Sequence, residues 1–254
     1  MNIKVCTLNI RKNKDEGQQS FDERLPLICH FIGEQSPDII GFQEVMPTQF
    51  EALKSLVPGY DFFSRGRLAD GSEEAVTVCW KKDVFRKKEG KTFWISDTPD
   101  EPGSRVEGCY WPRICTWVEL ETIKEPHITL KVYNAHFDNE VKEAQFLGAK
   151  LLLKAISDDE SNGKEKAILM GDFNLEPQTD VIRFIKESKE VRLADLTEGL
   201  KTTYHDWGRT SEKIDYIFTT DAVKPISFGK TSEIVAKTGS YISDHWPVVA
   251  EVEI

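Results

Sequence analysis

Residues 166–177 read KAILMGDFNLEP, an apolar run that stops at Gly171 and is followed at once by Asp172 and Asn174. A short apolar run closed by a glycine predicts a buried strand that reaches its C-terminal end there. In α/β proteins that end of a sheet is where polar side chains meet ligand. Asp172 and Asn174 stand two apart, so in an extended chain both point the same way and can position water or a phosphate oxygen. A simple turn, in which Asp and Asn bond the backbone, is the alternative for this stretch alone.

Similar apolar runs recur along the whole chain. Between several of them, apolar residues at helical spacing predict helices within residues 20–35, 47–59, 139–156 and 179–188. Because strands and helices are mixed throughout, without a repeat, low-complexity tract or linker, we expect one α/β domain over residues 1–254. The predicted strands are Ile3–Ile10, Asp38–Val45, Ala75–Trp80, Ile114–Leu120, Ile128–Phe137, Lys166–Phe173, Lys213–Thr219 and Pro247–Ile254.

Two of these helices carry start signals. Ser20 followed by Glu23 matches a capping box, although Pro26 is expected to kink this helix or delay its start. Pro47 is a plausible first residue of the next helix, which should close at Pro58. The longest irregular segments are expected at residues 91–113 and 193–211, and long loops in compact domains are often functional.

Composition restricts the class of protein. The chain has 254 residues and a formal net charge of −10, which argues against a protein that coats nucleic acid through a basic face. No apolar run is long enough for a transmembrane helix, and the N-terminus lacks the features of a signal peptide. The five cysteines include no CxxC pair, so reduced thiols in a cytoplasmic protein are expected.

Polar side chains also mark the ends of other apolar segments. Asp215 lies inside the apolar stretch EKIDYIF, where a carboxylate without a partner would be costly. The segment SDHWPVV places Asp244 and His245 just before the last predicted strand. Earlier strand ends offer Asn9, Glu44, Asn134, His136 and Asp138. Each of these residues could instead cap a turn or be satisfied inside the core, but their recurrence favours one shared site.

The motifs TLNI, QEV, NAHFD, GDFN, IDYIF and SDHWPVV follow one another in this order over nearly the whole chain. In that order they resemble the endonuclease/exonuclease/phosphatase superfamily of metal-dependent phosphohydrolases. The segment at residues 92–120 resembles a bacterial branch related to the carbon-catabolite-repressor-type deadenylases and nocturnin. The resemblance implies an α/β, DNase I-like fold: a four-layer sandwich in which two mixed β-sheets pack face to face and are flanked by helices.

The chemistry of phosphoester hydrolysis suits these residue types. A divalent cation, Mg²⁺ or Mn²⁺, neutralises the phosphate oxygens and stabilises the leaving group. Glu44 is expected as a carboxylate ligand, with Asn9 and Asp244 supporting the metal region. The expected catalytic residues are Asp172 and Asn174 for the attacking water, His136 and His245 as donors to the transition state, and Asp215 to orient His245.

Substrate contacts are assigned more loosely. Several relatives carry an acidic residue where this chain has Arg11, so a second metal position would be poorer in carboxylates and Arg11 is expected to grip phosphate instead. We also place Arg113, Asn134 and His205 at the substrate, the last because its loop resembles a family loop near the site. Asn139 stands where a histidine is expected in relatives of this branch.

The substrate remains open at this stage between two classes. The branch resemblance favours a 3′–5′ exonuclease-like phosphodiesterase on RNA or oligonucleotide ends, and the alternative is a phosphatase or phosphodiesterase of a small phosphorylated metabolite. Neither long duplex nucleic acid nor a membrane is an expected partner. A third hypothesis, a degenerate member that only binds phosphate ligands, predicts loss of at least one of the acid or histidine positions, and all of them are present. The aromatic residues Trp94, Tyr110, Trp111, Trp207 and Trp246 could stack a base or sugar or fill the core.

Overall fold

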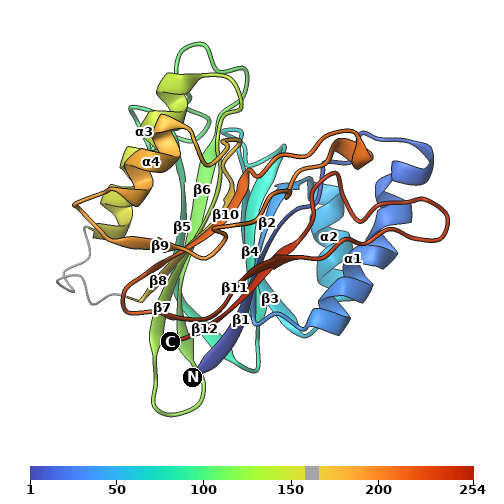
Figure 1. Cartoon of the computed structure of the whole chain (residues 1–254), viewed down its shortest axis with the longest axis horizontal. Coiled ribbons are helices and arrows are strands. Elements are labelled where there is room, and N and C mark those ends of the chain that lie inside the picture. The colour runs from blue at the N-terminus through green and yellow to red at the C-terminus, as the bar shows by residue number, and fades with distance from the viewer. Residues whose placement is uncertain (158–165) are drawn as a thin grey trace.

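The computed structural model describes residues 1–157 and 166–254. Two six-stranded sheets face each other across the centre of the molecule, and pairs of helices lie outside them (Figure 1). Helices α1 and α2 cover one sheet, and α3 and α4 cover the other. This arrangement confirms the predicted α/β four-layer sandwich with two mixed sheets.

The first sheet has the strand order β11-β12-β1-β2-β4-β3. Strands β1 and β2 are parallel, and every other pair in this sheet is antiparallel. The parallel pair in the middle of the sheet therefore sends two C-terminal ends to the same edge. The strands are β1 (Asn2–Asn9), β2 (Ile39–Val45), β3 (Tyr60–Gly66), β4 (Ala75–Lys81), β11 (Lys224–Thr231) and β12 (Val248–Glu253).

The second sheet repeats this plan with the order β5-β6-β7-β8-β10-β9. Its single parallel pair is β7 and β8, again in the middle. Strand β10 runs antiparallel to β8, so its N-terminal end lies beside the C-terminal end of β8. The strands are β5 (Phe85–Trp94), β6 (Ile114–Thr122), β7 (Thr129–His136), β8 (Ala167–Asp172), β9 (Leu193–Asp195) and β10 (Asp215–Thr220).

The helices are α1 (Phe21–Gln35), α2 (Pro47–Leu56), α3 (Lys142–Ser157) and α4 (Asp180–Lys186). Helix α2 begins at Pro47 as predicted, and the Gln49 side chain accepts a hydrogen bond from the Met46 N–H at 3.0 Å. The predicted capping box of α1 is wrong, because the Ser20 side chain makes no cap hydrogen bond. Pro26 lies inside α1 without delaying its start. Burial of Ile28 and its apolar neighbours against the sheet outweighs the lost backbone bond.

Three apolar layers hold the four structural layers together. The central layer fills the space between the sheets with side chains such as Val5, Val132 and Met170. Outer layers lie under α1 and α2 and under α3 and α4. The inner faces of both sheets are largely apolar, with a small buried polar group that includes Gln43 and Asn134 between them. Among the described residues, no helix is both long and apolar enough to span a bilayer.

All eight predicted strands are present, each within two residues of its expected ends. The structure adds four strands that the sequence did not predict: β3, β5, β9 and β11. These four are the edge strands of the two sheets. β5 runs into the segment at 91–113, which was expected to be irregular throughout, and β9 opens the segment at 193–211.

Candidate active site

Strand register brings three of the predicted side chains together. His136 at the end of β7 is paired with Asp172 at the end of β8, and Asp172 is paired with Asp215 at the start of β10. From the facing sheet, Asn9 ends β1 and Glu44 lies near the end of β2. The four C-terminal ends of the two parallel pairs thus meet at one edge of the sandwich.

Asn9 joins the two sheets at this edge. Its Nδ2 donates to Glu44 Oε1 at 3.1 Å and to Asp172 Oδ2 at 3.0 Å. Its Oδ1 accepts the N–H of Arg11 at 2.9 Å, and the side chain is fully buried. Asn9 therefore spaces the two carboxylates, and its support of the metal region stays a prediction. The tie also fixes the separation of the sheets at the site.

Local backbone features aim the two key carboxylates. Glu44 has a φ of 60°, beside an irregularity in the pairing of β2 with β4, and such an irregularity re-aims a strand side chain. Gly171, directly before Asp172, has a φ of 144°. A Cβ at Gly171 would lie 2.0 Å from the carbonyl oxygen of Ala135, so only glycine allows β8 to approach β7 there. The close approach of β8 to β7 therefore explains why glycine ends the apolar run at position 171.

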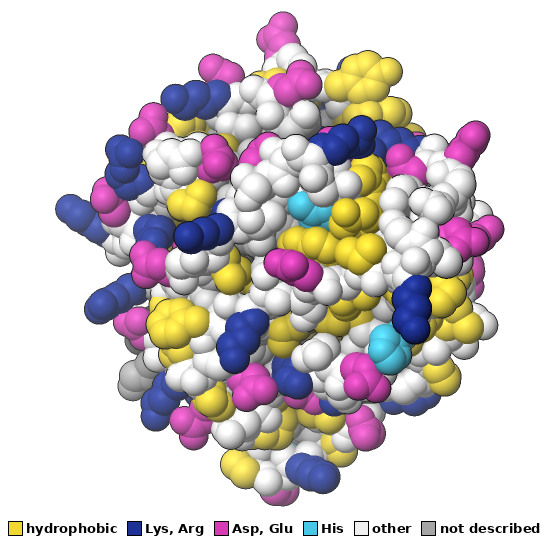
Figure 2. Space-filling model, turned by 45° about the vertical axis from the view of Figure 1, so that its right-hand side comes forward, with side chains coloured by type: hydrophobic (Ala, Val, Ile, Leu, Met, Phe, Trp, Pro, Cys, Tyr) yellow, Lys and Arg dark blue, Asp and Glu magenta, His cyan; other side chains and the backbone are white. Residues whose placement is uncertain are grey.

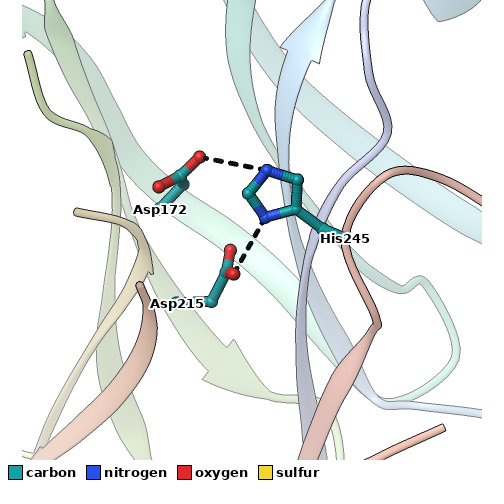
Figure 3. Close-up of side chains that lie close together, drawn as sticks. All are labelled: Asp172, Asp215 and His245. Atoms are coloured by element: carbon teal, nitrogen blue, oxygen red, sulfur yellow. Dashed lines mark hydrogen bonds and ion pairs between the residues drawn. The ribbon is translucent and has the colours of Figure 1, made fainter. Parts of the chain in front are cut away.

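His245 lies between two buried aspartates (Figure 3). Its Nδ1 donates to Asp215 Oδ2 at 2.9 Å, and its Nε2 lies 3.7 Å from Asp172 Oδ2. Burial by itself lowers the pKa of His245, but attraction to Asp215 and Asp172 raises it to about 10. The ring is therefore protonated at neutral pH, and Asp215 fixes its orientation as expected.

The carboxylates carry opposite pKa shifts. Burial, reinforced by Asp215, raises the pKa of Asp172 to about 7. Burial also raises the pKa of Glu44 by itself, but His136 and the Lys12 N–H outweigh it and hold that pKa at about 2. Acids with pKa values pushed apart in one site are typical of acid–base chemistry.

Asp244 is the third carboxylate at this edge and is 1% exposed. Its Oδ2 lies 3.1 Å from an Arg11 guanidinium nitrogen, and its Oδ1 accepts from Ser243. Burial nevertheless raises the pKa of Asp244. Asp172, Asp215 and Asp244 are all buried at this edge, beside the partly buried Glu44. Carboxylate oxygens in such a site suit a hard cation such as Mg²⁺ or Mn²⁺.

One group of possible ligand atoms lies within 4.8 Å of one another and comprises Asp172, Asp215 and His245. A cation in their midst would compete with the 2.9 Å hydrogen bond between His245 and Asp215. The group is therefore suited to proton and hydrogen-bond chemistry, whereas Glu44 and Asp244 offer carboxylate oxygens at the pocket that could hold a cation.

Arg113 is held at the site by a hydrogen bond to His136. One of its terminal nitrogens lies 3.1 Å from His136 Nε2, and its Nε donates to Asp138 Oδ2 at 3.3 Å. A guanidinium can only donate, so His136 Nε2 is the acceptor. Burial and the positive Arg113 accordingly lower the pKa of His136 well below its usual value. In this arrangement His136 positions Arg113, and it does not offer the donated hydrogen bond that we expected of it.

Most of the side chains described above line one pocket of about 410 Å³. Small-molecule sites usually occupy about 300–1,000 Å³. On the face drawn in Figure 2, dark-blue basic and magenta acidic side chains are interspersed, without a continuous basic stripe. The expected site residues that line the pocket are Arg11, Glu44, Arg113, His136, Asp172, Asn174, Asp244 and His245.

Two expected substrate contacts lie elsewhere. Asn134 is fully buried between the sheets, where it hydrogen-bonds Gln43 and backbone carbonyl groups of Phe42 and Thr77. His205 is 3% exposed and stacks on Trp246 at a centroid distance of 3.8 Å. Neither lines the pocket. Both are polar residues beside site motifs, and sequence position alone did not separate a supporting side chain from one that faces the substrate.

Other supporting residues occupy places that their motifs suggested. Asn174 has a φ of 52°, and its N–H donates to Asp172 Oδ1 at 2.9 Å. Its Nδ2 donates to the carbonyl of Phe137, so the GDFN stretch is both a turn and part of the site. Arg11 pairs with Asp15 as well as with Asp244. Its guanidinium is therefore already engaged by two carboxylates.

One wall of the pocket, and the support of the loop beneath it, are formed by residues that were not predicted as site residues. Lys12, Arg67 and Glu74 line the pocket beside Trp111. Arg24, which is fully buried in α1, donates to the carbonyl oxygens of Ile10 and Arg11 and so supports the loop after β1. No sequence signal marks these charges, because charged residues in loops and on helices are usually solvated. Opposite this wall, Tyr204, Glu212 and Ile214 complete the lining.

Known proteins match this chain over nearly its whole length. A structure from Bacteroides vulgatus, an endonuclease/exonuclease/phosphatase, is 29% identical and has a TM-score of 0.92, with 100% of this chain and 99% of that chain covered. A mannosyl-6-phosphatase of Bacteroides thetaiotaomicron is 27% identical with a TM-score of 0.87, with 99% and 100% covered. The catalytic domain of human nocturnin is 20% identical with a TM-score of 0.79, with 99% and 95% covered, and its likeness concerns the fold.

The family resemblance seen in the motifs is confirmed by a family model. The endonuclease/exonuclease/phosphatase model matches residues 6–245, which run from β1 to His245 and so include every strand end of the site. The family groups endonucleases, exonucleases and phosphatases, which act on phosphoester bonds, and the neighbour from Bacteroides thetaiotaomicron is a mannosyl-6-phosphatase. The chain belongs to the endonuclease/exonuclease/phosphatase family.

Proposed function

We propose that this protein is a Mg²⁺- or Mn²⁺-dependent phosphoester hydrolase that acts on a small phosphorylated compound. Water attacks phosphorus in line with the leaving group, without a covalent intermediate. The observation that carries the proposal is the pair of buried aspartates on either side of a protonated His245, at the floor of a pocket of about 410 Å³. The proposed general base Asp172, the donor His245 and the carboxylates proposed for the cation all line this pocket.

Each side chain has one task in this mechanism. Asp172 orients the attacking water and takes its proton, for which a pKa of about 7 is well matched to neutral pH. The Asn174 N–H holds the other Asp172 oxygen in place. His245 donates from Nε2 to a phosphoryl oxygen as charge develops, while Asp215 holds Nδ1. Glu44 supplies a carboxylate for the cation.

The bound cation supplies charge neutralisation at the phosphate and the leaving oxygen. Asp244 is the second carboxylate assigned to it, on the pocket side of Arg11. Arg113 is the phosphate clamp, because its guanidinium faces the pocket and His136 and Asp138 fix its orientation. Because these contacts already fix the guanidinium, it loses little conformational entropy when it binds phosphate.

Pocket size and charge support a small substrate. The volume of about 410 Å³ suits one phosphorylated unit. The net charge of −10 gives a polyanion little attraction beyond the pocket. The similarity to a mannosyl-6-phosphatase at 27% identity over full length also supports a phosphomonoester.

A short RNA or oligonucleotide 3′ end is the second candidate. One observation favours it: Tyr110 is 79% exposed and lies edge to face with the pocket residue Trp111, at a centroid distance of 5.1 Å. An exposed aromatic ring next to a phosphate site can stack a base. This candidate predicts release of nucleoside monophosphates, whereas the first predicts release of inorganic phosphate.

A substrate panel tests the proposal. Hexose 6-phosphate, p-nitrophenyl phosphate, a nucleoside monophosphate, a dinucleotide, poly(A) and NADPH are each assayed with Mg²⁺, with Mn²⁺ and with EDTA. We expect metal-dependent phosphate release from at least one monoester, and loss of at least about 10²-fold in rate for Asp172→Asn. Asp180→Asn, at a side chain 57% exposed in α4, is the control and should match wild type. Hydrolysis that is indifferent to EDTA and to Asp172→Asn would refute the mechanism.

A further inference from the structure

A network of buried charges lies in the pocket beside the catalytic carboxylates. Glu74 Oε1 accepts from Lys12 Nζ at 2.7 Å, and both Glu74 oxygens accept from the two terminal nitrogens of Arg67 at 2.9 and 3.0 Å. Arg67 also pairs with Glu73 at 3.0 Å. Arg67 is 3% exposed and Glu74 is 6% exposed. Two cations and two anions therefore balance in this wall, in which the Lys12 and Glu73 side chains remain 24% and 26% exposed.

This wall also fixes the position of an aromatic ring. The Arg67 guanidinium lies 4.4 Å from the ring centroid of Trp111, within the range of a cation–π contact. The carbonyl of Arg67 accepts from Trp94 Nε1 at 2.7 Å, which holds the arginine backbone in turn. Trp111 and Glu74 both line the pocket. A ring supported on one face by a buried guanidinium is pre-organised for contact with a ligand.

The side chains of Arg67 and Glu74 hydrogen-bond to Glu73, Lys12 and each other rather than to the residues assigned to the cation or the scissile phosphate. Removing charges from water is costly, and an ion network of this kind rarely adds stability over apolar packing of the same volume. Because Glu73 and Glu74 neutralise Arg67 and Lys12, the wall offers little attraction to a second phosphate. The wall can instead contact a ligand through hydrogen bonds.

Unused hydrogen-bond capacity remains on Lys12 and Glu74. An ammonium has three donors, and one of those on Lys12 is used on Glu74. A carboxylate has about four acceptor positions, and three bonds occupy those of Glu74. The pair thus presents donors and an acceptor from groups 2.7 Å apart. Two neighbouring hydroxyl groups, each of which both donates and accepts, are complementary to such a pair.

The same residue links this pair to the reacting centre. The backbone N–H of Lys12 donates to Glu44 Oε2 at 3.0 Å, while its side chain reaches Glu74. Arg113, the phosphate clamp, follows Trp111 by two residues. A group bonded to a phosphate at Arg113 and Glu44 would therefore lie against the Lys12–Glu74 pair and Trp111, within one pocket.

We propose that Lys12, Glu74 and Trp111 form a subsite for a leaving group with vicinal hydroxyls, so that the substrate class is a phosphomonoester of a sugar or similar polyol. This inference rests on the proposed hydrolase function. In the subsite, Glu74 accepts from one hydroxyl, Lys12 donates to its neighbour, and the indole of Trp111 packs against the C–H face of the ring. Glu74 and Trp111 act as specificity-determining residues.

The ratio of two kcat/KM values tests the subsite. One substrate is a hexose 6-phosphate and the other is p-nitrophenyl phosphate, whose leaving group has no hydroxyl pair. We expect the ratio to favour the hexose phosphate in wild type and to fall roughly 10–100-fold in Glu74→Gln, the range for loss of a hydrogen bond to a charged group. In Trp111→Leu, which loses aromatic packing, the ratio should fall by about 2–10-fold. Glu73→Gln is the matched control, because it removes one contact to Arg67 and none to Lys12. It should keep the wild-type ratio.

The possible failures are distinguishable. If wild type hydrolyses neither substrate with Mg²⁺ or Mn²⁺, the proposed function fails and the subsite with it. If both kcat/KM values fall in parallel in Glu74→Gln, the network only supports the loop of Lys12, and the subsite is refuted while the hydrolase function stands. A strong preference for a hexose bisphosphate over the monophosphate, lost in Lys12→Gln, would replace the hydroxyl subsite with a second phosphate site.

Discussion

Lys213 offers a prediction whose size follows from its surroundings. Its side chain is 3% exposed, its Nζ has no hydrogen-bond partner, and the nearest carboxylate oxygen, on Asp195, is 3.9 Å away. The ammonium lies over the ring of Tyr216. Burial lowers the pKa of Lys213 from 10.5 to about 7, and the attraction of Asp195 offsets only part of that shift.

The sign of the pH dependence follows from that lowered pKa. Between pH 7 and 10.5 the unfolded chain holds a proton on Lys213 that the folded protein has released. The free energy of unfolding therefore rises with pH in this window, by about 1.36 kcal/mol per pH unit. The shift of 10.5 − 7 = 3.5 units corresponds in full to about 5 kcal/mol, which is the order of the penalty present below pH 7.

Urea unfolding of wild type and Lys213→Met measures this effect. The unfolding free energy of wild type minus that of the variant should rise by about 2.7 kcal/mol from about pH 7.5 to about pH 9.5. Ile217→Val, in the strand β10 that follows Lys213, is the control: it loses about 0.5–1.5 kcal/mol without removing a titratable group, so its difference from wild type should not vary with pH. A flat or falling difference for Lys213→Met would refute the account of a penalised buried ammonium.

The site and its backbone yield three further predictions. Asp215→Asn removes the charge facing His245 and should lower kcat by about 10²–10⁴-fold with a much smaller change in KM; steady-state kinetics on the substrate found in the panel decide this, and an unchanged kcat would remove Asp215 from the mechanism. Wild type should be stabilised by Mg²⁺ or Mn²⁺, by about 2.7 kcal/mol at a hundredfold excess over Kd; Glu44→Gln should lose most of this gain in thermal melts, and an equal gain would place the cation elsewhere. Gly171→Ala should destabilise the fold by more than about 3 kcal/mol, because its Cβ would lie 2.0 Å from the Ala135 carbonyl oxygen at a φ of 144°; chemical denaturation that finds a loss below about 1 kcal/mol would show that β8 can shift there.

The sequence identified the interior strands and missed the edges. A strand with neighbours on both sides, such as β8, is buried on both faces and appears as an unbroken apolar run. An edge strand such as β5, FRKKEGKTFW, carries five charged residues in its first seven positions. Charges at an edge deter pairing with other chains, and they also hide the strand from a search for apolar periodicity.

The site divides in a similar way. Polar residues at the ends of apolar strands, such as Glu44, Asp172 and His245, can be found from the sequence. A charged group is costly to bury without a partner, so its place beside an apolar run indicates a specific partner or a function. Asn134 also fits that pattern, but strand register turns it between the sheets toward Gln43. His205 fits it as well, but it stacks in a buried layer on Trp246.

By itself the sequence determined the family, the order of the interior strands along the chain and the set of acids and histidines that end them. These features are local, since each depends on a run of apolar side chains and the residue that stops it. Only the tertiary structure decided which of these residues share a pocket, and that Arg67 and Glu74 form its far wall. Contacts between residues far apart in the chain depend on strand register and sheet packing, and a one-residue change of register would turn each side chain to the opposite face.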